Sequence, residues 1–178
     1  MNKLTHNMNI QYNRMLILVI ILIIFNSCFT MRYSTTGASI SDDVKTFSVS
    51  YFQSRAPLAT PTLGQDFTEK LKDKFLDQTN LQIIDGYGHL HFEGEITSYE
   101  TKPMGIQANE TAAQTRLSIR VHVKFVNEKD TDKNFEKDFD HYEDFSSDLS
   151  LEQVQDEYNE TILGKIIEDI FNQAVVNW

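Results

Sequence analysis

The residue types best suited to chemistry lie together in the segment His89-Leu90-His91-Phe92-Glu93. In a β-strand, alternate side chains share a face, so this segment would place two imidazoles and a carboxylate side by side. Such nitrogen and oxygen donors can bind zinc and leave one position open for a catalytic water. The alternative is a solvated strand face whose Glu93 pairs with a basic residue on the next strand. The second interpretation is favoured, because no cluster elsewhere completes a metal site.

Four basic side chains form a second group along one predicted strand: Arg116, Arg120, His122 and Lys124. Guanidinium groups bind phosphate in a bidentate way, and lysine acts as a point charge. One hypothesis is therefore that Arg116, Arg120 and Lys124 bind a phosphorylated, anionic glycolipid. The other is that the row is neutralised by pairing with Glu93 and Glu95. The two hypotheses are compatible, since a partly neutralised ribbon can still bind phosphate at its free end.

The single cysteine, Cys28, follows an N-terminal segment in which Lys3 and Arg14 precede an apolar run over residues 15–25. This run is shorter than the roughly 20 residues of a membrane-spanning helix and is typical of a secretory signal. The sequence Phe-Asn-Ser-Cys at residues 25–28 resembles a bacterial lipobox, whose cysteine accepts a diacylglycerol and becomes the new N-terminus. A disulfide partner is absent from the sequence, which favours acylation over an ordinary cleaved signal.

Three segments are predicted: a removed signal over residues 1–27, a lipidated tether over 28–43, and one domain over 44–178. The formal charge of −10 becomes −12 without the signal, which carries two basic residues and no acidic one. So acidic a domain is a poor ligand for nucleic acid and for anionic membrane surfaces. The membrane link is therefore expected to come from the lipid alone. The sequence contains no G-x-S-x-G elbow and no Gly-rich phosphate loop, so nucleophilic catalysis has little support.

The apolar spacing predicts the elements of this domain. Phe47, Val49 and Tyr51 alternate with polar residues, as in a half-buried strand. Pro57 and Pro61 mark a loop. A helix is then expected from an N-cap at Thr62 to about Asn80, with four apolar residues at four-residue spacing: Leu63, Phe67, Leu71 and Phe75. A last helix is expected after Ser150, with seven apolar residues at helical spacing: Leu151, Val154, Tyr158, Ile162, Ile166, Ile170 and Ala174.

The two clearest alternating runs, residues 90–96 and 117–125, predict an antiparallel hairpin joined by a long loop. The predicted register sets four pairs opposite each other: Phe92 and Val123, Ile96 and Ile119, Glu95 and Arg120, Glu93 and His122. A less regular acidic strand over residues 135–145 follows. The order of elements predicts an α+β fold: a two-layer sandwich with two amphipathic helices on one face of a mostly antiparallel, four- to five-stranded sheet.

Several segments, taken in order, resemble the LptE family of lipopolysaccharide-assembly lipoproteins in its Bacteroidetes-type form. After the lipobox cysteine these are residues 33–40 (YSTTGASI), 47–49 (FSV), 77–81 (DQTNL), 92–99 (FEGEITSY) and 116–121 (RLSIRV). Thr35 departs from the aromatic residue usual there. The family is divergent and has no catalytic signature, so the resemblance depends on the order of these segments.

The resemblance implies a role as a non-enzymatic subunit, without cofactor, of the lipopolysaccharide translocon. Family members sit at the inner leaflet of the outer membrane, plug an LptD-type β-barrel, help it assemble, and help pass lipopolysaccharide to the surface. Basic residues of the family's sheet contact the glycolipid, which implicates Arg116, Arg120 and Lys124 here. The long loop over residues 102–114 is uncharged at its centre and would enter the barrel lumen, with contacts expected at four residues: Pro103, Met104, Gly105 and Ile106. Residues 29–32 carry no acidic residue, which fits a periplasm-facing, lipid-anchored position.

Overall fold

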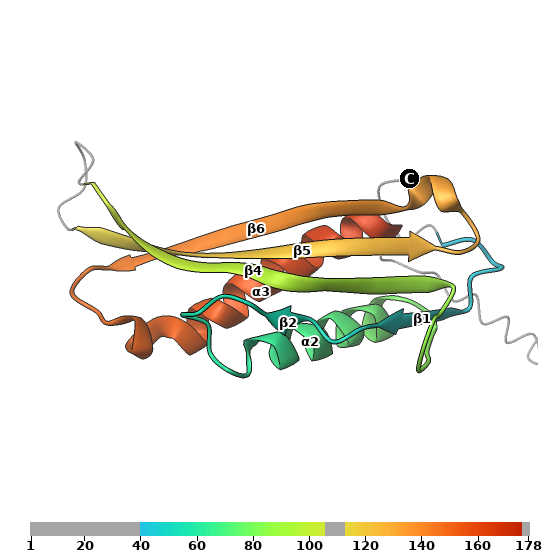
Figure 1. Cartoon of the computed structure of the whole chain (residues 1–178), viewed down its shortest axis with the longest axis horizontal. Helices are drawn as coiled ribbons and strands as arrows, with labels where there is room; N and C mark the ends of the chain where they lie inside the picture. Colours follow the sequence, from blue (N-terminus) through green and yellow to red (C-terminus); the bar gives the residue numbers. More distant parts are fainter. Residues whose placement is uncertain (1–39, 106–112, 176–178) are drawn as a thin grey trace, which may run out of the picture. The chain divides into compact units, whose positions relative to one another are not determined.

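The computed structural model describes residues 40–105 and 113–175. In this part of the chain two helices lie against a six-stranded sheet of order β3-β1-β4-β5-β6, with β2 also beside β4 (Figure 1). The strands are β1 (Thr46–Val49), β2 (Gln53–Ser54), β3 (Gln82–Ile83), β4 (Leu90–Met104), β5 (Gln114–Asn127) and β6 (Phe135–Ser146). The helices are α2 (Leu63–Gln78) and α3 (Leu151–Val175), and the short 3-10 helix η1 (Thr131–Lys133) joins β5 to β6.

The predicted α+β sandwich is confirmed, with two differences in the sheet. Helix α2 packs against β1 and β2, α3 packs against β5 and β6, and the helices contact each other (Figure 1). The sheet has more strands than expected and is mixed, because β1 runs parallel to β3 and β4 and β2 runs parallel to β4. Strands joined through a helix are usually parallel, and α2 lies between β1 and β4 in the chain. Only β4, β5 and β6 form the expected antiparallel ladder.

The core between the layers is rich in aromatic side chains. Phe75 of α2 has its ring centroid 5.5 Å from Phe47, 4.8 Å from Phe92 and 5.1 Å from Phe171. All four side chains are buried, and burying one such ring stabilises the fold by roughly 1.5–3 kcal/mol. One residue from each of β1, α2, β4 and α3 meets here, so this cluster holds the two layers together.

Both helices bury the stripes that the sequence predicts. In α2 the predicted stripe is fully buried, and in α3 five of the predicted residues are buried: Val154, Ile162, Ile166, Ile170 and Ala174. Thr62 precedes α2 but its side chain makes no capping hydrogen bond. The helix ends at Gln78, before Asn80, where the Thr79 hydroxyl donates to the Phe75 carbonyl at 2.6 Å. Among the described residues, no helix has the length and apolar character needed to cross a membrane.

The predicted register of the β4–β5 hairpin is wrong, although the predicted buried face is right. Phe92 lies opposite Phe125, and Ile96 lies opposite Val121. Each partner on β5 is two residues later than predicted, and a two-residue shift keeps every side chain on its own face. Apolar alternation specifies which face is buried but cannot distinguish registers that differ by two residues.

An irregularity between Ile96 and Ser98 then shifts the register by one more residue. Beyond it Tyr99 lies opposite Ile119 and becomes a core residue, 2% exposed. Such a bulge also increases the local twist of the strand. The hairpin is longer than the alternation indicates, since pairing continues to Met104 opposite Gln114. The predicted loop over residues 102–114 is therefore shortened at both ends.

Candidate functional site

The face of the sheet that points away from the helices carries the basic residues predicted as a binding site. On β5 these are Arg116, Arg120, His122 and Lys124, here called the cationic row. Acidic residues of the neighbouring strands contact it: Glu93 on β4, and Glu136, Asp138, Asp140 and Asp144 on β6. Antiparallel sheets commonly solvate one face in this way. Every member of the cationic row has an acidic partner.

Arg116 is the most firmly held member of the row. Its Nε and Nη2 donate to the two carboxylate oxygens of Asp144, each at 2.8 Å, and its guanidinium carbon lies 3.6 Å from the centre of the Tyr142 ring. Hydrogen bonding from Arg116 lowers the pKa of Asp144. A bidentate pair stacked on an aromatic ring is among the stronger surface interactions. Little of this guanidinium is left for an external phosphate.

Arg120 is the least constrained member. Its Nε lies 3.8 Å from the Asp140 carboxylate, too far for a good hydrogen bond, and its side chain is 51% exposed. Lys124 is intermediate: its Nζ donates to Glu93 at 2.6 Å, which lowers the pKa of that carboxyl, and its side chain is 46% exposed. Of the three predicted glycolipid ligands, Arg120 is thus the most available to an added anion.

His122 lies between two carboxylates of β6. Its Nδ1 is 2.8 Å from Asp138, and its Nε2 is 3.2 Å from Glu136. Hydrogen bonds to Asp138 and then Glu136 raise the pKa of His122, because both carboxylates favour the imidazolium form. The structure therefore favours a charged His122 under mildly acidic conditions.

This pairing gives a testable dependence of stability on pH. The pKa of His122 is raised in the folded chain. Its contribution to the free energy of unfolding is therefore complete below the unfolded-state pKa of about 6.5 and is lost as pH rises through the folded-state pKa. We expect His122→Gln to lower the melting temperature by about 1–2 °C near pH 5.5 and by less near pH 8.5. Ser118→Ala, on the same face, should show an equal deficit at both pH values. A His122→Gln deficit that grows at higher pH would contradict the assigned pairing.

Of the five acidic partners of the cationic row, the sequence predicts only Glu93. The predicted pairing of the row with β4 is confirmed for Lys124 and Glu93, although the predicted partner of Glu93 was His122. The predicted pairing of Glu95 with Arg120 is wrong: Glu95 lies opposite His122 and forms an ion pair with Arg55. The partners on β6 were missed. Their signal is the period-two placement of acidic residues from Glu136 to Asp144, which matches the cationic row across an antiparallel pair.

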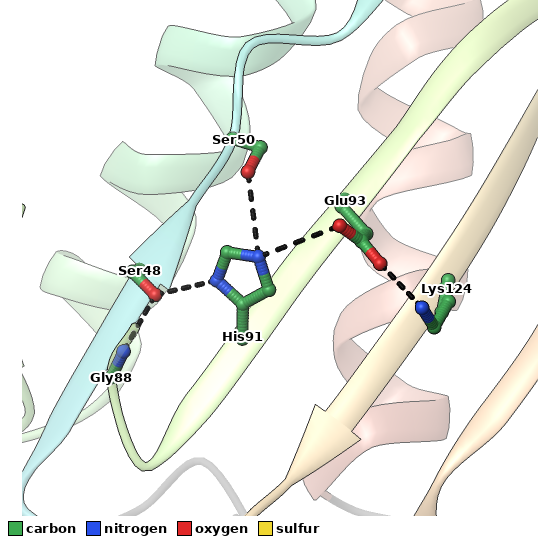
Figure 2. Close-up of polar contacts among 6 residues, drawn as sticks. All are labelled: Ser48, Ser50, Gly88, His91, Glu93 and Lys124. Atoms are coloured by element: carbon green, nitrogen blue, oxygen red, sulfur yellow. Dashed lines mark hydrogen bonds and ion pairs between the residues drawn. The ribbon is translucent and has the colours of Figure 1, made fainter. Parts of the chain in front are cut away.

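His91 lies on the same outer face, at the corner formed by β1 and β4, yet it is only 3% exposed (Figure 2). The Gly88 N–H donates to Ser48 Oγ at 2.8 Å, and Ser48 Oγ lies 2.7 Å from His91 Nδ1. Ser48 Oγ therefore links the Gly88 backbone to the imidazole and holds the ring in place. Burial lowers the pKa of His91, and nearby Glu93 only partly offsets this. His91 is a neutral, structurally fixed imidazole.

The zinc interpretation gains no support from this geometry. His89 precedes β4, and its Nδ1 accepts the backbone N–H of Lys45 at 3.0 Å, while His91 Nδ1 is occupied by Ser48. Glu93 is held by Lys124 and lies 3.8 Å from His91 Nε2. Across residues 40–105 and 113–175, no three His, Cys, Asp or Glu side chains are grouped so that they could hold a metal ion.

The sequence also misassigned the first strand. β1 ends at Val49, so Tyr51 lies beyond it and is 61% exposed instead of half-buried. Ser48 was expected to face solvent and is 2% exposed, because His91 covers it. A serine that alternates with apolar residues looks solvated from the sequence, and only the neighbouring strand reveals its burial.

The predicted barrel-contact residues lie where β4 ends. Pro103 and Met104 form the last pairs of the hairpin, opposite Thr115 and Gln114, and Gly105 follows the strand. Pro103 and Gly105 are exposed, and Met104 is partly exposed. Ile106 lies outside the described residues, as do Cys28 and the predicted signal segment.

The folded part of the chain matches a known family. The LptE sequence model, described as Lipopolysaccharide-assembly, covers residues 44–174. The chain belongs to the LptE family. Membership gives it a role in lipopolysaccharide assembly at the outer membrane, where LptE proteins are non-enzymatic lipoprotein components that act with lipopolysaccharide and the LptD barrel.

Solved structures with a similar arrangement of elements have low sequence identity to this LptE chain. A minor lipoprotein from Acinetobacter baumannii is 12% identical, with a TM-score of 0.45, over 73% of this chain and 91% of that one. A hypothetical protein from Chlamydia trachomatis is 11% identical, with a TM-score of 0.45, over 74% of this chain and 98% of that one. No curated protein sequence matches the chain significantly.

Proposed function

We propose that this LptE protein is a lipid-anchored, non-catalytic subunit that plugs an LptD-type β-barrel, helps it assemble and aids lipopolysaccharide insertion at the cell surface. The observation that carries the proposal is the family match over residues 44–174, which spans nearly all of the described fold. The outer face of the sheet supports a binding role through Arg120 and Lys124, whose side chains are 51% and 46% exposed. Nothing in that arrangement prepares a nucleophile or a metal-bound water.

The membrane link is proposed to be a diacylglycerol on Cys28, after removal of residues 1–27, with the chain facing the periplasm. Two or more acyl chains anchor a protein stably where one does not. Residues 28–43 would form the tether and residues 44–178 the working domain. Ile40 already packs against the core, so the last residues of this tether belong to the folded domain.

The tip of the β4–β5 hairpin is the proposed contact with the barrel. Pro103, Met104 and Gly105 lead into the segment that was predicted to enter the lumen, together with Ile106. Among the described residues, no atom lies within 4 Å of where a Gly105 side chain would begin, which leaves space for a partner there. Residues 103–109 carry no charged side chain, so this part of the hairpin end can enter a barrel without burying an unpaired charge.

The cationic row is the proposed site for the phosphates of lipopolysaccharide, through Arg116, Arg120 and Lys124. The existing ion pairs determine how readily each of these three residues could bind a phosphate. Arg120 can turn to a phosphate with little loss, Lys124 must share with Glu93, and Arg116 would have to break a bidentate pair with Asp144. The proposal therefore places most of the recognition on Arg120 and Lys124.

Purification of the tagged, lipidated chain from membranes tests the proposed partnership. We expect an LptD-type barrel and lipopolysaccharide to elute with it. A chain that elutes alone after mild detergent extraction would overturn the proposal.

The same purification separates the two partners. An Arg120→Ala, Lys124→Ala variant should keep the barrel but carry several-fold less lipopolysaccharide, because the two most available cations of the row are lost. Lys70→Ala, Lys74→Ala on α2 removes the same charge from the other layer and should change neither. Equal lipopolysaccharide in both variants would exclude the cationic row as the binding site.

A further inference from the structure

A cavity of about 240 Å³ opens where β1, β3 and β4 meet, beside the buried His91. This cavity is here called the corner pocket. Six polar residues line it: Ser48, Ser50, Lys72, Asp85, Tyr87 and His91. Drug-sized ligands usually occupy roughly 300–1,000 Å³, so this volume suits a group of about one ring. The pocket is separate from the cationic row, although Glu93 links the two by contacting both His91 and Lys124 (Figure 2).

Tyr87 forms an aromatic wall of the corner pocket. Its ring stacks on the His91 ring, with centroids 3.9 Å apart and planes 30° from parallel. Because Tyr87 is nevertheless 71% exposed, much of its side chain remains open to a ligand. The face of an aromatic ring carries negative potential and attracts the C–H groups of an apolar ring face. A large aromatic ring held flat by a buried residue and otherwise largely exposed is a stacking platform.

The other polar groups that line the corner pocket carry no net positive charge. Burial lowers the pKa of His91 and favours the neutral ring, while Ser48 contacts its Nδ1 at 2.7 Å, so His91 contributes dipoles and no charge. The Ser50 hydroxyl lies 3.4 Å from His91 Nε2, a weak contact that leaves the hydroxyl able to bind a ligand. Lys72 and Asp85 also line the pocket, and the Lys72 ammonium is already paired with Glu69 at 2.9 Å. Donors and acceptors without net positive charge suit hydroxyl groups and do not favour phosphate.

We propose that the corner pocket binds an uncharged sugar ring, which stacks on Tyr87 and hydrogen-bonds through its hydroxyls to Ser50 and Asp85. This inference rests on the proposed function, because the sugar would belong to the oligosaccharide of the same lipopolysaccharide. The chain would then hold the molecule at two points: phosphate on the cationic row and a neutral sugar at the corner pocket.

Titration of the full chain in detergent with dephosphorylated lipopolysaccharide core oligosaccharide, followed by NMR at Tyr87 and Gly88, tests the inference. We expect saturable shifts in the wild-type chain. Tyr87→Ala should weaken binding about tenfold or more, through loss of stacking and contact area, while Tyr87→Phe should bind like the wild type. Tyr51→Ala is the matched control, since Tyr51 is an equally exposed aromatic residue that does not line the pocket.

Three results would overturn the inference: no shift at Tyr87 and Gly88, equal binding by Tyr87→Ala and the wild type, or displacement of the oligosaccharide by inorganic phosphate. Tyr87→Ala should still co-elute with the barrel. If Tyr87→Ala loses the sugar but keeps the barrel, the inference is supported independently of the barrel. Elution of the chain without a barrel would instead contradict the proposed function.

Discussion

We expect deletion of residues 106–112 to reduce recovery of the LptD-type barrel with the chain by about tenfold or more, a loss of at least about 1.4 kcal/mol in association. The reason is geometric. Strands β4 and β5 remain paired out to Met104 and Gln114, so the sheet holds both residues from which the connecting segment departs. The binding energy of an interface is concentrated in few residues near its centre, and a tip inserted into the barrel lumen would lie there.

The deletion is designed to spare the fold. It joins Gly105 to Ala113, which leaves a two-residue connection between the paired Met104 and Gln114, and glycine at the first position suits a type II′ turn. It also keeps the hydrogen bond from the Ser147 N–H to the Ala113 carbonyl, 3.0 Å in length. The melting temperature should stay within a few degrees of the wild-type value, and the amount of barrel in the eluate is the measurement. Undiminished barrel with this stable variant would remove the tip from the interface.

The sequence predicts the layers of this fold better than their connections, for a physical reason. Helical and strand periodicities are local, so the stripe of α2 and the alternation of residues 90–96 follow from nearby residues alone. The parallel pairing of β1 with β4 depends on the path of the chain through α2, and no short stretch of sequence encodes this path. The strand register is predicted only in part. Alternation predicts which residues of β4 and β5 share a face, but the Phe92–Phe125 pair depends on the full length of the hairpin and on the bulge after Ile96.

The candidate sites follow the same division. The cationic row is visible as a period-two pattern within β5, and its partnership with Glu93 follows from the hairpin. The corner pocket is invisible in the sequence, because its members come from β1, α2, the turn before β4, and β4 itself. Tyr87 in particular looks like part of a Gly-Tyr-Gly turn until the structure stacks it on His91. Sites built within one element can be predicted from sequence, whereas sites built between elements need the fold.

Gly94 shows how closely β4 and β5 must approach to form the outer face. A Cβ at Gly94 would lie 2.0 Å from the carbonyl oxygen of His122 and 2.7 Å from Cε1 of the buried Phe52. The first contact is with backbone of the neighbouring strand and cannot be relieved by a side-chain rotation. Gly94→Ala must therefore separate the strands locally and displace the Phe52 ring. Overpacking of this kind costs about 1–3 kcal/mol, and the backbone contact places Gly94→Ala near the upper value.

We expect Gly94→Ala to lower the free energy of unfolding by about 3 kcal/mol and the melting temperature by about 10 °C. Gly164→Ala is the matched control: the residue is exposed within α3, its Cβ would meet open space, and alanine in a helix is favoured over glycine by up to about 1 kcal/mol. The same substitution should thus destabilise the chain at one site and stabilise it at the other. Because the His122 carbonyl belongs to the strand that carries the cationic row, Gly94→Ala should also weaken lipopolysaccharide retention. If Gly94→Ala is as stable as the wild type, the prediction is wrong: β4 and β5 would then be far enough apart to accept a methyl group at Gly94.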